Sequence, residues 1–127
     1  MKKSESNVRP QVLEQHVNGV HVFRWGVVER QRTRPEWDEE NSQWVDVEET
    51  YYEYYELFVQ DGSPANTKAA CIDALWGGGV EQKLTNDYLA AKEGVFTGEK
   101  AAASVSAYLA FLSERQALKD AVDAAYG

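Results

Sequence analysis

The sequence predicts an α+β protein, with a long antiparallel β-hairpin in the N-terminal half followed by three helices. Two observations predict this class. Residues of high strand propensity fill about 19–33 and 44–60. From about residue 66 onward, apolar residues recur at helical spacing and glycines interrupt them. The chain has 127 residues, which fits a single α+β domain over 1–127.

The N-terminal part, before the first long strand, is the least regular. Residues 1–10 are polar and end at Pro10, so we expect them to form a flexible arm. The stretch 11–18 fits either a short strand or a turn of helix. The first long strand, about 19–33, follows. Its strand-forming residues are Val20, Val22, Phe23, Trp25, Val27 and Val28.

Charge predicts how the two long strands pair. Residues 1–35 are rich in arginine, whereas 36–56 hold nine acids and no base. If the loop between the strands is 38–42, three arginine–acid pairs form on the even-numbered face of the hairpin. These pairs are Arg24–Glu56, Arg32–Glu48 and Arg34–Asp46. The alternative is that the acids form a docking surface of their own.

The odd-numbered face of the same hairpin is the face that we expect to contact the helices. It places Phe23 opposite Leu57, and Trp25 opposite Tyr55. These are large apolar and aromatic side chains, which stabilise a sheet most when they are buried.

Three helices are expected over about 66–76, 80–92 and 99–125. The first follows Pro64, with Ser63 or Asn66 as its N-cap, and the glycines at 77–79 end it. Gly94 ends the second helix. The third is rich in alanine and carries two apolar stripes. One stripe contains Val105, Tyr108, Leu109, Leu112 and Gln116, and the other contains Phe111, Leu118 and Val122.

Composition excludes several classes of partner. The formal net charge is −8, so most of the surface repels a polyanion and we expect no nucleic-acid partner. No stretch approaches the ~20 apolar residues of a membrane helix, so we expect no membrane partner. The N-terminus lacks the pattern of a signal peptide, and a single cysteine suits a reducing compartment. We therefore expect a cytoplasmic protein.

No combination of residues indicates catalysis, so we expect no enzyme, no catalytic residue, no cofactor, no bound metal and no small-molecule substrate. His16 and His21 would point to opposite faces of a strand, which does not favour a shared metal. Cys71 has no nearby His or Cys partner and is expected to be a buried thiol. The glycines at 77–79 are followed by Glu81, whose charge is wrong for a phosphate site.

The aromatic residues of the hairpin are the candidate functional feature. The candidate interface residues are Tyr52, Tyr54, Phe58, Trp37 and Trp44. One sheet face can pack on the helices, so rings on the other face either pack under the N-terminal segment or meet another protein. The expected partner is a second protein, or a second copy, bound through the hairpin. The alternative is a carbohydrate-binding module that stacks sugars on exposed, coplanar Trp or Tyr rings.

Three stretches of the C-terminal half carry a family resemblance. They are 67–76 (TKAACIDALW), 81–94 (EQKLTNDYLAAKEG) and 107–119 (AYLAFLSERQALK). Together, over about 44–120, they resemble small uncharacterised proteins of gut Bacteroidetes and their prophages, and the layout resembles the small proteins that accompany phage tail genes. The resemblance implies a structural protein of a virion, or an accessory protein of tail assembly, located in the host cytoplasm or in the particle.

Overall fold

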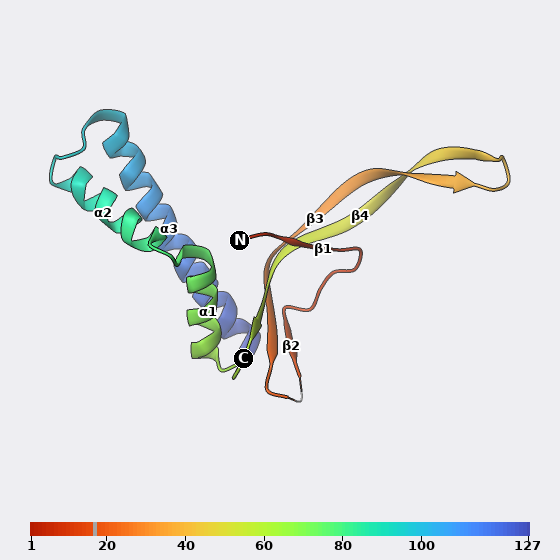
Figure 1. Ribbon diagram of the computed structural model, residues 1–127, viewed down its shortest axis with the longest axis horizontal. Helices are drawn as coiled ribbons and strands as arrows, with labels where there is room; N and C mark the ends of the chain where they lie inside the picture. The colour runs from red at the N-terminus through yellow and green to blue at the C-terminus, as the bar shows by residue number, and fades with distance from the viewer. Residues whose placement is uncertain (17) are drawn as a thin grey trace.

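The computed structural model describes residues 1–16 and 18–127; Val17, in the stretch left open between strand and helix, lies outside them. It has a four-stranded antiparallel sheet followed by three helices, which confirms the predicted α+β class (Figure 1). The elements are β1 (Ser4–Ser6), β2 (Leu13–Gln15), β3 (His21–Asp38), β4 (Gln43–Val59), α1 (Pro64–Trp76), α2 (Val80–Lys92) and α3 (Gly98–Tyr126).

Two short strands extend the long hairpin at its base. The strand order is β1-β4-β3-β2, so each short strand pairs with the outer edge of a long one. In β1, Ser4 lies opposite Tyr54 and Ser6 opposite Tyr52. Residues 1–10 are therefore not the wholly free arm that was expected. The open edge of a long strand offers unpaired N–H and C=O groups, and the N-terminal segment satisfies them.

The hairpin is longer than predicted. Strand β3 continues to Asp38 and β4 begins at Gln43, although 34–43 contains residues typical of turns. Pro35 lies opposite Asp46 within the paired region. It is tolerated there because each strand of a two-stranded ribbon has an open edge, where a missing N–H breaks no ladder bond.

The predicted register is correct at the base of the hairpin and wrong beyond it. Arg24 lies opposite Glu56 and Trp25 opposite Tyr55, as expected, and a bulge then occurs between Trp25 and Val28. Gly26 lies in this bulge with a φ of 63°, a conformation that glycine adopts without strain. Two predicted pairs are lost, since Arg32 lies opposite Glu49 instead of Glu48, and Arg34 opposite Val47 instead of Asp46.

The helices begin and end close to the predicted residues. Ser63 is the N-cap of α1, and its Oγ accepts a hydrogen bond from the backbone N–H of Asn66 at 3.1 Å. Pro64 occupies the first turn, where its missing N–H costs nothing. Helix α2 packs against α3, and α1 packs against both α3 and β4.

The core lies where the sheet meets the helices. Its fully enclosed cluster contains Phe23, Cys71, Leu118 and Val122, with Trp25, Leu57 and Trp76 packed around it. The odd-numbered face of the hairpin base is therefore the core face, as predicted. We call this region the junction: residues 21–25, 54–77 and 111–126.

Two arms diverge from the junction and give the molecule a V shape (Figure 1). The hairpin arm is 27–53, and the helical arm is 78–110. Within these two described ranges, no residue is buried. The chain exposes 8389 Å², whereas a compact monomer of 14.3 kDa exposes about 6,800 Å². The chain therefore exposes roughly 1,600 Å² more surface than a compact monomer does, because its shape is open.

Candidate functional site

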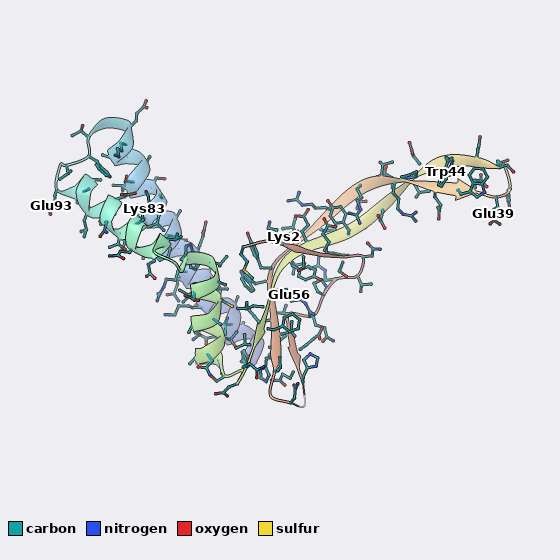
Figure 2. All side chains as sticks on the ribbon, viewed as in Figure 1. Lys2, Glu39, Trp44, Glu56, Lys83 and Glu93 are labelled. Carbon is teal, nitrogen blue, oxygen red and sulfur yellow. The ribbon has the colours of Figure 1, made fainter. Side chains whose placement is uncertain are left out.

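The predicted interface residues do not form one patch. Trp37 and Trp44 lie at the tip of the hairpin arm, whereas Tyr52, Tyr54 and Phe58 lie near its base. At 3.3 Å per residue, Trp44 and Phe58 are about 45 Å apart along β4. Figure 2 shows this separation, with Trp44 and Glu39 at the far end of the arm and Glu56 at its base. The tip and the base are therefore separate candidate surfaces.

The N-terminal segment covers the two tyrosines at the base. Tyr54 is only 7% exposed, and the guanidinium of Arg24 lies 6.0 Å from its ring centre. Tyr52 is half-buried, with the guanidinium of Arg9 5.1 Å from its ring centre. Tyr54 therefore packs under the N-terminal segment, which is one of the two arrangements expected for these rings. It is not available to a partner.

Phe58 and the tip tryptophans remain exposed. Phe58 is 66% exposed although Val22, its cross-strand neighbour, is buried. Trp44 is 68% exposed, and its ring lies edge-on to that of Trp37, with centres 5.5 Å apart and planes at 68°. A flat sugar-binding platform needs coplanar rings, so this geometry does not favour the carbohydrate-binding alternative.

Acidic side chains surround the tip, and local hydrogen bonds hold its turn. The Asp38 carboxylate accepts hydrogen bonds from the side chain of Asn41 at 2.7 Å and from the backbone N–H of Glu40 at 3.1 Å. The Asn41 side chain is the largest cause that holds the pKa of Asp38 below its usual value. With Glu39, the tip thus presents two tryptophans beside negative charge.

The shaft of the hairpin arm carries a ladder of ion pairs. Arg30 contacts Glu53 at 2.9 Å, and Arg32 contacts Glu49 at 2.9 Å. The Arg32 guanidinium also lies 4.1 Å from the ring centre of Tyr51. The strands therefore do neutralise each other as the charge pattern predicts. Arg32 does so through Glu49, one residue from the predicted Glu48, and Arg34 contacts Glu36 and Glu49 instead of the predicted Asp46.

Arg24 at the base is the most enclosed of the arginine pairs. It contacts both Glu56 and Glu14 at 2.6 Å. Burial lowers the pKa of Arg24, but its hydrogen bonds with Glu56 and Glu14 outweigh this effect, so the pKa is raised. The sequence indicated Glu56 as a partner and missed Glu14, because β2 forms by pairing with β3 and has no clear signal of its own.

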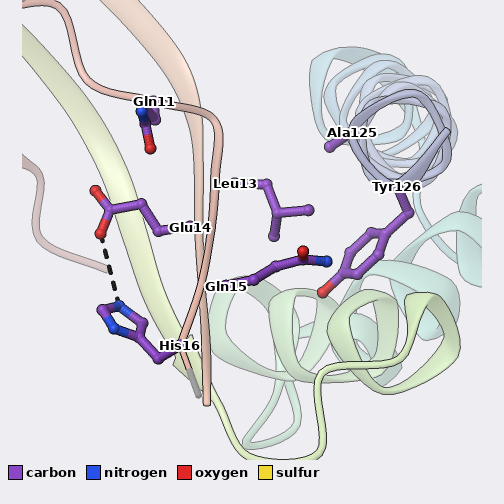
Figure 3. Close-up of a pocket in the computed structure, with 7 residues that line it drawn as sticks. All are labelled: Gln11, Leu13, Glu14, Gln15, His16, Ala125 and Tyr126. Carbon is purple, nitrogen blue, oxygen red and sulfur yellow. Dashed lines mark ion pairs between the residues drawn. The ribbon is translucent and has the colours of Figure 1, made fainter. Parts of the chain in front are cut away.

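The junction carries several hollows, and two of them adjoin the sheet. One, of about 650 Å³, lies between β2 and the end of α3 (Figure 3). Its wall includes the Glu14–His16 pair, with Oε2 and Nε2 3.6 Å apart, and Tyr126. The other, of about 470 Å³, lies between the sheet and helices α1 and α3 and is lined mainly by apolar side chains. Its titratable lining groups are Tyr55 and Glu114, which do not form an acid–base pair of the kind catalysis needs.

The remaining reactive side chains, His21 and Cys71, are hydrogen-bonded or buried within the fold. His21 Nδ1 lies 2.8 Å from the Tyr126 hydroxyl, which also lies 2.9 Å from the hydroxyl of Thr67. Cys71 is buried, as predicted, and burial raises its pKa to about 12. Across 1–16 and 18–127, no three His, Cys, Asp or Glu side chains gather as metal ligands. In the same residues, no helix has the length and hydropathy to cross a membrane.

Comparison with known proteins identifies no relative. No family model, no curated protein and no solved structure matches the chain. The resemblance of 44–120 to prophage and Bacteroidetes proteins therefore stays a prediction.

One exposed apolar surface was not recognised from the sequence. Leu89 and Leu109 are exposed on the helical arm, and Leu112 is exposed on the adjoining turn of α3. The signal was present, because α3 carries two apolar stripes side by side. The stripe with Phe111, Leu118 and Val122 is buried against the sheet and α1, whereas the stripe with Leu109 and Leu112 is not.

Proposed function

We propose that this chain is a non-enzymatic structural protein that acts by docking its hairpin arm onto another protein or onto a second copy of itself. The observation that carries the proposal is the pair Trp37 and Trp44, held at the far end of a long arm and exposed there. Tryptophan is the residue most often responsible for binding energy at protein interfaces. An arm that buries none of its described residues brings this pair well away from the rest of the chain.

The surroundings of the tip describe the partner surface that would fit. Asp38, Glu39 and Glu40 flank the aromatic pair, so a complementary surface has an apolar centre and a basic rim. The turn is already held by hydrogen bonds to Asp38, which lowers the entropy lost on docking. The tip of the hairpin arm is therefore a rigid, aromatic projection.

The narrower role, a phage or prophage virion component or a tail-assembly accessory protein, comes from the resemblance over 44–120. A thin projecting arm suits such assemblies because subunits often hold one another through extensions. We keep this role as part of the proposal.

The test compares tip variants with a matched pair on the shaft. We expect Trp37→Ser/Trp44→Ser to lose the association that runs through the tip. The solution mass by light scattering falls below that of the wild type where the partner is a second copy, and capture of proteins from the producing cell is lost where the partner is another protein. Gln31→Ser/Thr50→Ser alters a cross-strand pair on the same arm and is expected to keep the association. Unchanged association in the tryptophan variant contradicts docking through the tip.

A further inference from the structure

The helical arm and the adjoining turn of α3 expose leucines that the chain itself does not cover. Leu109 is 56% exposed and Leu89 is 51% exposed, and Leu112 is also exposed. Burying a leucine is favourable because it removes apolar surface from water. Three of them uncovered on one short helical hairpin therefore form a surface that a partner could stabilise.

Helical geometry places Leu89 and Leu109 on the same side of the arm. Helices α2 and α3 run antiparallel, and Tyr88 stacks on Tyr108 with ring centres 4.4 Å apart (Figure 1). Each leucine directly follows one of these tyrosines, so it is rotated by about 100° from the contact. Because the helices run in opposite directions, the two rotations turn both leucines to the same side.

This side of α3 has the spacing of a helix–helix seam. Its residues are Ala102, Val105, Leu109, Leu112 and Gln116. The intervals are three, four, three and four residues, which is the a/d pattern of paired helices. We call these five residues, together with Leu89, the leucine face.

The α3 part of the leucine face carries no charge, although the chain as a whole is strongly acidic, and on α2 the exposed Lys92 and Glu93 beside Leu89 have opposite charges. Ser106 and Ser113, which flank it on α3, are also uncharged. The ion pair between Lys83 and Asp87 lies on the opposite side of the arm by the same helical geometry. Depletion of charge at the centre is typical of protein interfaces.

The pattern indicates a second copy as the occupant. The leucine face is nearly symmetric about Leu109, since Ala102 and Gln116 each lie one heptad from it, and Val105 and Leu112 lie four residues before it and three after it. A two-fold axis at Leu109 would place the small Ala102 of one copy against the longer Gln116 of the other. Two copies that each carry a net charge of −8 can approach most easily through an uncharged face.

We propose that the leucine face is a self-association surface, on which the α3 helices of two copies pack antiparallel and cross at Leu109. With the two α2 helices, they form a four-helix arrangement. This surface lies on the other arm from the tip tryptophans, so the two docking sites are independent.

The test measures solution mass by light scattering over a wide range of concentration. We expect a dimer for the wild type and a monomer for Leu109→Glu, because the two introduced carboxylates would face each other at the two-fold axis. Ala107→Glu makes the same change in charge on the exposed, opposite side of α3 and is expected to stay dimeric. Circular dichroism of both variants checks that the helices remain folded. The comparison is repeated in the Trp37→Ser/Trp44→Ser background, where docking through the tip is removed and the dimer formed by the leucine face should remain.

A second variant tests the geometry directly. At the two-fold axis, cysteines introduced by Leu109→Cys should form an intermolecular disulfide under mild oxidation, while Ala107→Cys should not. Buried Cys71 does not compete for this reaction. A wild type that is monomeric at all concentrations, or a Leu109→Glu variant that keeps the wild-type mass, would overturn the proposal.

Discussion

The junction and the two arms use the same residue types in opposite ways. On helix α3, Leu118 is 5% exposed in the junction, whereas Leu109, less than three turns away, is 56% exposed in the helical arm. Trp25 and Trp76 pack against the core, whereas Trp37 and Trp44 lie at the tip of the hairpin arm. The difference is that the sheet and helices α1 and α3 converge only at the junction, so only there can apolar side chains be enclosed from all sides.

This comparison separates stability from interaction. The junction contains the core that holds the chain together, and the arms contain exposed apolar groups and ion pairs that contribute little within a monomer. Changes in the junction should therefore affect the free energy of unfolding, and changes in the arms should affect association.

The reactivity of cysteine should differ most between the two regions. We expect Cys71 to react with a thiol reagent more slowly by orders of magnitude than a cysteine introduced by Thr50→Cys, because Cys71 is enclosed and its pKa is about 12. The folded state favours the neutral thiol, so its contribution to stability is complete below pH 9.0 and is lost as the pH rises toward about 12. Equal reaction rates at Cys71 and at position 50 would contradict the difference between the junction and the hairpin arm.

Truncation of a core side chain should have the largest effect on stability. Phe23 is fully enclosed, so Phe23→Ala should lower the free energy of unfolding by about 3–5 kcal/mol. Leu109→Ala, in the helical arm, should change it by less than about 1 kcal/mol at a concentration where the protein is monomeric. Urea unfolding of both variants measures the contrast, and similar losses would contradict it.

Addition of one methyl group at the base of the sheet should also lower the free energy of unfolding. A Cβ at position 62 would collide with the Cβ and ring of His21, which cannot rotate away without leaving Tyr126. Gly62→Ala should therefore cost about 1–3 kcal/mol. Gly78→Ala, at a position with open space around it, isolates the separate cost of a positive φ; if both variants lose the same amount, overpacking is not the cause.

Loss of one hydroxyl at the end of α3 should have a moderate effect. Tyr126→Phe removes the contacts with His21 and Thr67, and should lower the free energy of unfolding by about 1–2 kcal/mol. Tyr88→Phe removes the same atom from the helical arm and should have little effect. A shift in thermal midpoint for the second variant as large as for the first would argue against a special role for Tyr126.

Removal of an ion pair from the hairpin arm should have the smallest effect. Arg32→Gln should leave the urea midpoint nearly unchanged, because the Arg32 side chain is 41% exposed and Glu49 keeps Arg34 at 3.6 Å as a second partner. Arg24→Gln should lower the midpoint clearly, since it leaves two partly enclosed carboxylates without their partner. The reverse order would mean that the arm contributes more stability than its burial indicates.

The parts of the fold that were predictable are those with local signals. Pro64, the glycines at 77–79 and Gly94 mark the ends of helices whatever the rest of the chain does. Strands β1 and β2 have three residues each and form because long neighbours offer open edges, so their own sequence does not specify them.

The register shows a second limit. Acids at both 48 and 49 allow Arg32 to find a partner in either register, so charge alone could not distinguish them. Gly26 within a strand was the available signal for a bulge. For the candidate site, the sequence could not predict two exposures. Tyr54 is buried because β1 pairs beside it, and Leu109 is exposed because few elements pack around that part of α3.

Hydrogen exchange of backbone amides tests the central claim most directly, since it reports stability residue by residue. In a dilute monomer, we predict the slowest exchange in 21–25, 55–59, α1 and 111–126, set by global unfolding. Amides in 29–52 and 80–110 should exchange faster, through local opening of the arms. Exchange in both arms as slow as in the junction would contradict the account, because it would mean that the arms share in a single cooperative core.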